Sequence, residues 1–211
     1  MDISAIRSEY KQKSLDESHV LENPLDQFAL WFDEALKAEL LEPTAMVLGT
    51  SDGSGLVTQR TVLLKAFDQK GFVFYTNYNS RKAKQIEKSK RVSVLFPWYG
   101  LERQVAISGE VERVSKAESL KYFLSRPKGS QMGAWISNQS SVITSRSILE
   151  TKLAEMKSKF GNGEIPLPDF WGGFRIIPNS IEFWQGRPNR LHDRLLFSKE
   201  AQEWKMERLA P

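Results

Sequence analysis

The order of strand-like and helix-like segments is the feature of this sequence that most restricts its fold. Between residues 44 and 80, runs of β-branched and aromatic residues are separated by Asp52-Gly53, Gly55 and Lys70-Gly71, which predicts a meander of three strands. Further strands are predicted at 91–98 and 103–114, with Pro97 at the turn between them, and four more after residue 170. Strands and helices do not alternate regularly, so the sequence favours an antiparallel sheet or barrel over a doubly wound parallel sheet.

Helices are predicted around this sheet. Asn23 as N-cap and Pro24 at the first helical position begin a helix whose apolar residues repeat at helical spacing and which ends before Pro43. Other helices are expected at residues 80–88, 115–126 and 146–160. The fold class is therefore mainly β with peripheral helices. Residues 1–20 are interpreted as a polar, mobile N-terminal arm, and residues 21–211 as one domain.

Composition limits the possible functions. With 40% hydrophobic residues in 211, the chain can bury a sizeable core. It contains no cysteine, which excludes disulfides and thiolate nucleophiles and fits a reducing, cytoplasmic location. Two histidines, His19 and His192, argue against a zinc site, so no metal is expected. Neither a signal peptide nor an apolar run long enough to span a membrane is visible, so we expect no membrane partner.

Two clusters of basic residues are candidates for an anion site. The segment "RTVLLK" places Arg60 and Lys65 around an apolar run, on opposite faces of an ideal strand. A twist or bulge would bring both to one ligand; otherwise they are charges at strand ends. Ser80, Arg81 and Lys82 open a helix whose N-terminal amides attract phosphate. Residues 81–91 hold six basic side chains and one acid, which indicates an anionic partner or a solvated helix face.

Two further clusters carry candidate chemistry. Tyr122 and Arg126 lie four residues apart on one helix face and Ser130 follows, a set that suits a phosphate monoester, although an arginine at a helix C-terminus is also ordinary. In "EFWQGRPNRLHDR", an extended chain would point Arg190 and His192 to one side. No Gly-rich dinucleotide loop, phosphate-binding P-loop or catalytic triad stands out. An enzyme of this kind would therefore depend on a cofactor.

Taken together, these segments resemble the pyridoxine/pyridoxamine 5′-phosphate oxidase family. The similarity covers "RTVLLK", "FYTNYNSRKA", "YFLSRPKGSQMGAWISNQSS", "PLPDFWGGFR", "EFWQGRPNRLHDR" and the terminal "RLAP", in order from about Ile6 to Pro211. It implies a split β-barrel homodimer that binds flavin mononucleotide (FMN) at the subunit interface. The implied reaction oxidises pyridoxine or pyridoxamine 5′-phosphate to pyridoxal 5′-phosphate, with molecular oxygen as acceptor and hydrogen peroxide, plus ammonia from the amine, as by-product.

The resemblance also assigns residues to roles. Its flavin contacts are Arg60, Thr61, Val62, Leu63, Leu64, Lys65, Tyr75, Thr76, Arg81, Lys82, Gln104, Gln139, Ser140, Trp184 and Arg194. Its substrate-phosphate contacts are Lys65, Tyr122, Arg126 and Ser130. Arg190 and His192 cover the pyridine ring and are the catalytic pair, and Leu191 between them is a further substrate contact. The N-terminal lid, which also binds substrate, comprises Arg7, Ser8, Glu9 and Tyr10.

Two positions depart from the family pattern. Ser8 stands where a second arginine can occur, and Glu42 where an aspartate is expected.

The residues alone leave two other functions open. One is a split-barrel flavoprotein that oxidises a different substrate. The other is a flavin-free module that binds nucleic acid through residues 81–91, although the other basic residues are scattered and no nucleic-acid motif is visible. We therefore expect small phosphorylated pyridines, and no nucleic acid, as partners.

Overall fold

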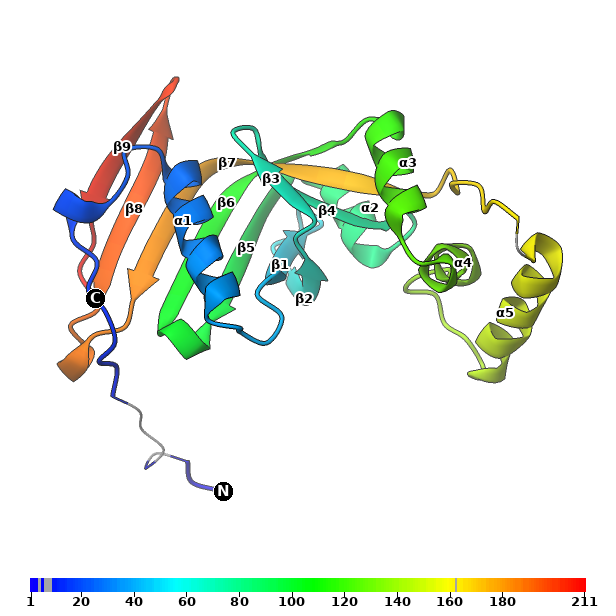
Figure 1. Cartoon of the computed structure of the whole chain (residues 1–211), viewed down its shortest axis with the longest axis horizontal. Coiled ribbons are helices and arrows are strands. Elements are labelled where there is room, and N and C mark those ends of the chain that lie inside the picture. The colour runs from blue at the N-terminus through cyan, green and yellow to red at the C-terminus, as the bar shows by residue number, and fades with distance from the viewer. Residues whose placement is uncertain (4, 6–8, 162) are drawn as a thin grey trace.

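The computed structural model describes residues 1–3, 5, 9–161 and 163–211. This part of the chain forms one antiparallel sheet with helices around it (Figure 1). Its strands are β1 (Ala45–Ser51), β2 (Val57–Leu63), β3 (Ala66–Asp68), β4 (Gly71–Asn77), β5 (Arg91–Trp98), β6 (Arg103–Arg113), β7 (Trp171–Gln185), β8 (Asp193–Glu200) and β9 (Glu203–Arg208). Its helices are α1 (Pro24–Lys37), α2 (Arg81–Lys88), α3 (Lys116–Ser125), α4 (Lys128–Ile136) and α5 (Ser147–Phe160), with 3₁₀ turns η1 (Glu17–His19), η2 (Tyr99–Leu101) and η3 (Pro188–Arg190).

The sheet curls until its two edges meet. The strand order is β2-β1-β5-β6-β7-β4-β3, and β8 pairs with both β7 and β9. Strands β2 and β3 lie at opposite ends of this order, yet only Leu64 and Lys65 separate them in the chain. The Leu64 amide donates to Thr44 O at 2.8 Å and the Lys65 amide to Val73 O at 2.8 Å. The first bond extends the β1–β2 ladder and the second the β3–β4 ladder, so this short connection links the two ends of the strand order and curls the sheet into a half-barrel.

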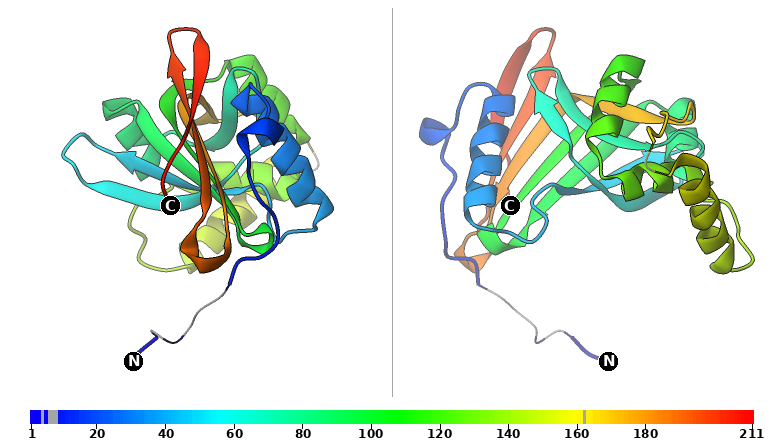
Figure 2. Two further views of the ribbon diagram at one scale, coloured as in Figure 1. Left: turned by 90° about the vertical axis from the view of Figure 1, so that its left-hand side faces the viewer. Right: turned by 45° about the vertical axis from the view of Figure 1, so that its right-hand side comes forward.

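Strand β7 connects two parts of the molecule. Its first half pairs with β4 and its second half with β8, while β6 pairs along its length. The register between β6 and β7 shifts at Ser108/Gly109, opposite Pro178, where proline removes a ladder donor. Helix α1 lies near the β8–β9 side of the sheet, and α3, α4 and α5 lie at the other end (Figures 1 and 2).

Aromatic residues fill the core. Phe28 of α1 is fully buried and contacts Phe72 and Phe96 at ring-centroid distances of 4.8 and 5.0 Å. Trp31 of the same helix meets Phe183 edge-on at 5.2 Å. The apolar stripe predicted for this helix is thus the face that covers the sheet. A second, smaller cluster around Phe123 and Trp171 lies between α3, α4 and α5.

The predicted fold class is confirmed, with local differences. The 44–80 region contains four strands rather than three, because β3 forms after the two-residue connection. Pro97 lies within β5, opposite Gln104, so the prediction that it forms the turn is wrong; the turn follows at η2. Helix α4 was not predicted, since Gly129 and Gly133 weaken its helical signal and tertiary packing overrides it. The two strands predicted between residues 174 and 186 are both parts of β7.

The N-terminal segment lies against the C-terminal hairpin. Leu15 is buried, and its amide donates to Asp193 Oδ2 at 3.0 Å. Arg208 of β9 donates from Nε and Nη2 to the two carboxylate oxygens of Glu17. Its Nη1 donates to Asp193 Oδ1 at 3.0 Å. The mobility and lid role expected of residues 1–20 stay predictions, and Arg7 and Ser8 lie outside the described residues. No described helix has the length and apolar character needed to cross a membrane.

Candidate functional site

A cavity of about 970 Å³ opens between β2, β4, the start of α2 and the α3–α4 pair. Most residues that the resemblance assigned to flavin or substrate phosphate line it: Arg60, Thr61, Val62, Leu63, Lys65, Tyr75, Thr76, Arg81, Lys82, Tyr122, Arg126, Ser130, Gln139 and Ser140. They come from segments up to 80 residues apart in the chain, and the curled sheet brings them together. Within the described residues, no carboxylate lines this cavity. Its walls therefore carry uncompensated positive charge, which favours an anionic ligand.

One corner of the cavity is built around Arg60 and Lys82. Arg60 is held by β1 and β2, because its Nη1 donates to Leu48 O at 3.1 Å and to Thr50 Oγ1 at 2.6 Å. Lys82 is 9% exposed, and its Nζ donates to Thr76 Oγ1 at 3.2 Å and Gln139 Oε1 at 3.1 Å. Burial, with a smaller contribution from Arg60, lowers the pKa of Lys82 to about 8. An anion beside Lys82 would raise its pKa again by stabilising the charged form.

The N-terminus of α2 opens at the same corner. Ser80 caps this helix, since its Oγ accepts the Ala83 amide at 3.4 Å. The Arg81 amide donates to Ser140 Oγ at 3.2 Å, which ties the 137–141 loop to the helix start. Amides at a helix N-terminus, a hydroxyl and two cations are the groups that bind a phosphate.

A second corner is built on stacked aromatic rings. Tyr75 and Tyr122 stack at 4.0 Å, and Trp171 lies parallel to both at 5.5 and 6.1 Å. The Arg126 guanidinium carbon lies 4.8 Å from the Trp171 ring. Burial raises the pKa of Tyr75 to about 12, so its phenol stays neutral. These contacts fix the positions of Tyr122 and Arg126 before any ligand arrives.

Arg126 carries the clearest sign of an anion-binding site. Its Nη1 is buried and, among the described residues, has no hydrogen-bond partner. A buried donor without a partner is costly, and burial accordingly lowers the pKa of Arg126. Ser130, on the first turn of α4, lines the same cavity. A phosphate bound here would supply the acceptor that Arg126 lacks.

The remaining predicted residues lie at the other end of β7. Gln104 and Trp184 line a separate cavity of about 360 Å³ with Tyr10 and Tyr99. The Trp184 and His192 rings are 4.7 Å apart. The Arg187 amide donates to His192 Nδ1 at 3.1 Å, which places the proton of the neutral ring on Nε2.

Arg190 and Leu191 differ from their predicted conformation. They do not belong to an extended strand: Arg190 ends the η3 turn with φ 62°, and β8 begins only at Asp193. The prediction that Arg190 and His192 alternate along a strand edge is therefore wrong. Pro188 and Asn189, whose φ is 57°, turn the chain outward and leave Leu191 68% exposed.

Four other positions considered in the sequence, Arg194, Leu64, Glu9 and Glu42, line neither cavity. Arg194 binds Glu182 at 2.8 and 3.1 Å and the carbonyl of Ala210 at 2.9 Å. The Leu64 side chain lies in the core. Glu9 forms an exposed ion pair with Lys11 at 2.7 Å. Glu42 is exposed, with φ 54°, and lines neither cavity.

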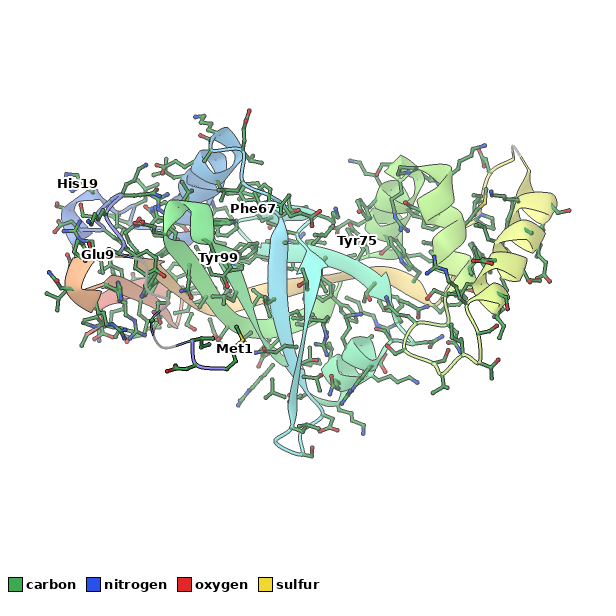
Figure 3. The ribbon with its side chains drawn as sticks, turned by 90° about the horizontal axis from the view of Figure 1, so that it is seen from below. Met1, Glu9, His19, Phe67, Tyr75 and Tyr99 are labelled. Carbon is green, nitrogen blue, oxygen red and sulfur yellow. The ribbon has the colours of Figure 1, made fainter. Side chains whose placement is uncertain are left out.

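The two cavities lie too far apart to share a small ligand within one chain. Trp171 of the first and Trp184 of the second are separated by most of β7, which at about 3.3 Å per residue is roughly 40 Å. Figure 3 labels Tyr75 from the first cavity and Tyr99 from the second, and the two lie in separate parts of the molecule. One chain therefore presents two incomplete regions.

Sequence analysis missed Trp171 as a site residue. It lies within "PLPDFWGGFR", but a lone tryptophan gives no signal for the cavity that it lines. The two glycines after it are informative in retrospect. A Cβ on Gly173 would come within 2.7 Å of the Tyr75 ring, so glycine here lets the strand approach the stacked tyrosines.

The curled antiparallel sheet and its cationic cavity define an anion-binding protein of split-barrel architecture. Comparisons with known proteins specify it further. The family model described as pyridoxamine 5′-phosphate oxidase matches residues 32–160, and that described as the pyridoxine 5′-phosphate oxidase C-terminal dimerisation region matches residues 171–211. The chain belongs to the pyridoxamine 5′-phosphate oxidase family.

Individual relatives agree with this assignment. Proteins named pyridoxine/pyridoxamine 5′-phosphate oxidase are 54% identical in Vesicomyosocius okutanii, over 100% of this chain and 99% of the relative, and 55% identical in Aliarcobacter butzleri, over 100% of both. Among solved structures, PhzG from Burkholderia lata 383 superposes with a TM-score of 0.89 at 26% identity, covering 95% of this chain and 99% of PhzG. A related FMN-binding protein from Nostoc punctiforme (TM-score 0.70, 16% identity, covering 87% and 97%) shares the fold.

Proposed function

We propose that this protein oxidises pyridoxine 5′-phosphate and pyridoxamine 5′-phosphate to pyridoxal 5′-phosphate with FMN as cofactor. Family membership and relatives of that name over the whole chain support the proposal. The observation that carries it is the cavity with two cationic corners and no lining carboxylate among the described residues, one corner holding the unpartnered Nη1 of Arg126. A flavin and a substrate that each end in phosphate need two such corners.

The corner around Lys82 suits the flavin phosphate. Lys82, Arg81 and the Ser140 hydroxyl would hold the phosphate, and β2 from Arg60 to Leu63 would border the ring system. When bound, FMN supplies the chemistry that the side chains lack, because it accepts a hydride from the substrate carbon and passes the electrons to oxygen.

The corner around Arg126 suits the substrate phosphate. Arg126 offers a fork of donors, while Tyr122 and Ser130 offer hydroxyls and Lys65 a second cation. Anchoring the substrate at one end sets the register of its pyridine ring against the flavin. Correct alignment of reacting atoms at about 3–3.5 Å supplies a large part of the rate enhancement in such reactions.

The groups that cover the pyridine ring come, in this proposal, from a second copy of the chain. Residues 171–211 match a dimerisation region, and a two-fold axis would bring Arg190, His192 and Trp184 of one chain to the large cavity of the other. Exposed apolar residues on and beside β2, Leu56, Val57 and Leu63, lie next to that cavity and suit such an interface.

Arg190 and His192 have different duties in this arrangement. Arg190 offers a planar guanidinium with several donors, so it orients the ring and stabilises negative charge. His192, with Nδ1 accepting the Arg187 amide, presents its Nε2–H to the ring and can move a proton there. Hydrogen peroxide, and ammonia from the amine substrate, would be the by-products.

An oxygen-consumption assay with pyridoxine 5′-phosphate and added FMN tests the proposal. We expect yellow protein and oxygen uptake that depends on substrate. Yellow protein without uptake would instead indicate a split-barrel flavoprotein with another substrate. Colourless protein with salt-sensitive RNA binding through residues 81–91 would indicate a binding module. The cytoplasmic location stays a prediction.

A further inference from the structure

Glu102 stands outside the reaction described above, yet it makes an unusual set of contacts. It follows the η2 turn between β5 and β6 and has a left-handed backbone, φ 54° and ψ 38°. Its carboxylate Oε2 accepts two consecutive amides of the N-terminal segment, Lys11 N at 2.8 Å and Gln12 N at 3.0 Å. The Gln12 side chain also donates to Gly100 O at 3.1 Å. One turn therefore holds two successive residues of a segment 90 positions away.

The residue just before these amides is Tyr10, and its ring lies on the candidate site. It meets the Trp184 ring edge-on at 5.6 Å and the His192 ring at 5.7 Å. It also packs on Gly186, where an added Cβ would come within 2.6 Å of Tyr10 Cγ. The Gly186 amide donates to the carbonyl of Glu102 at 2.7 Å. The side chain of Glu102 thus binds the segment that carries Tyr10. Its backbone carbonyl binds Gly186, the residue after β7 on which the Tyr10 ring packs.

The backbone of Glu102 argues that its side chain matters. Left-handed φ is unfavourable for an unbranched residue such as glutamate, and glycine, asparagine or aspartate suit it better. A turn with a purely structural task would gain from one of those residues. Their side chains are absent or shorter by a methylene, and would not extend as far toward the amides of residues 11 and 12.

We propose that Glu102 is a positioning residue that fixes Tyr10 against the Trp184–His192 wall, and so shapes the part of the site that covers the substrate ring. Gly186 complements it by leaving room for the Tyr10 ring. The proposal rests on the function proposed above for His192. Because the carboxylate binds backbone amides, it fixes the segment whatever side chains positions 11 and 12 carry, which keeps Tyr10 in place before substrate arrives.

The experiment compares Glu102→Asn with Glu102→Gln in the full-length protein. Asparagine suits the left-handed backbone but is too short to hold the amides, whereas glutamine keeps an oxygen at the same reach. For Glu102→Asn we expect amide hydrogen exchange at residues 11 and 12 to accelerate about tenfold, the factor for a loss of 1.4 kcal/mol. We also expect KM for pyridoxine 5′-phosphate to rise severalfold with kcat within about twofold, since ground-state binding is what is lost. Glu102→Gln should stay near wild type in both.

Two further variants keep the test decisive. Gly186→Ala, which crowds Tyr10 without touching Glu102's carboxylate, should raise KM in the same way. Lys13→Ala removes an exposed ion pair of the same segment, Lys13 to Glu34 at 2.9 Å, and should change neither the exchange at residues 11 and 12 nor KM.

Unchanged exchange at residues 11 and 12 in Glu102→Asn would overturn the inference, as would equal KM for the Asn and Gln variants. Failure of the proposed function would look different. The wild-type protein would then consume no oxygen with pyridoxine 5′-phosphate, while the exchange measurement would still report on the contact itself.

Discussion

The two ends of β7 are prepared for binding in different ways. Around Trp171, the large cavity is built from β2, β4, α2, α3, α4 and the start of β7, and stacked rings and hydrogen bonds already hold Arg126 and Lys82 in place. Around Trp184, Arg190 and Leu191 lie in an outward turn and are exposed. In the proposed function the first region holds both phosphates with groups of one chain, whereas the second presents Arg190 and Leu191 to solvent.

This difference suggests a division of labour between binding and chemistry. Phosphate binding depends on charge that is fixed in advance, because loose cations lose affinity to side-chain entropy. Covering the ring, by contrast, requires groups that arrive from the other side of the ligand. A chain that keeps these groups at the far end of a long strand can supply them only to another copy.

The largest effect is expected from Arg190→Ala. Turnover should fall about 100-fold or more, a loss of roughly 2.7 kcal/mol of transition-state stabilisation, because no other described cation in the outward turn replaces it. FMN should stay bound, since its phosphate is held in the other region. Steady-state turnover and the visible spectrum of the purified variant measure both. Unchanged turnover would remove the second region from the chemistry.

Arg126→Ala should act on binding instead. We expect KM for the substrate to rise about 30-fold, in the range for loss of a charged hydrogen-bonding group, with FMN retained. The free protein should lose only about 1 kcal/mol for the contact with the Trp171 ring, because Arg126 Nη1 has no hydrogen-bond partner among the described residues. Arg113→Ala is the matched control. That guanidinium also lies over a ring, Tyr78 at 4.1 Å, but it pairs with Glu87 outside the cavity. Loss of FMN in Arg126→Ala would contradict the division into two corners.

Mixing these two variants tests whether the regions come from different chains. In a randomly mixed population about half of the dimers carry one chain of each kind, and each has one site with both arginines intact. Activity at low substrate should therefore return to about a quarter of wild type, roughly eightfold above Arg126→Ala alone. Activity equal to the average of the two variants would show that each site is built from one chain.

The sequence predicted what depends on local signals and missed what depends on distant contacts. Strand periodicity and turn residues gave the β class, and caps such as Ser80 and Ser115 gave the helix starts. Alternation put Arg60 and Lys65 on opposite faces, yet both line one cavity, because Lys65 follows the end of β2, where the chain crosses to β4. The Arg190 turn and the role of Trp171 depend on packing between segments far apart, which no local pattern encodes.

The smallest effect concerns pH and isolates the flavin corner. Lys82 has a pKa of about 8 in the free protein, below its value in the unfolded chain, and must be charged to attract phosphate. Raising the pH from 7 to 8.5 should therefore weaken FMN binding about fourfold, because the protonated fraction of Lys82 falls as the pH passes its pKa. Over the same pH range the unfolded chain binds more protons than the folded one, so Lys82 makes the FMN-free protein more stable as pH rises through 8. Fluorescence titration of FMN measures the first trend and denaturant unfolding the second. Lys82→Arg keeps its charge, so FMN affinity in this variant should depend little on pH. A pH dependence equal to that of the wild type would assign the effect to another group. Arg190→Ala is the control: it lies at the far end of β7 and should keep the wild-type pH dependence of FMN binding.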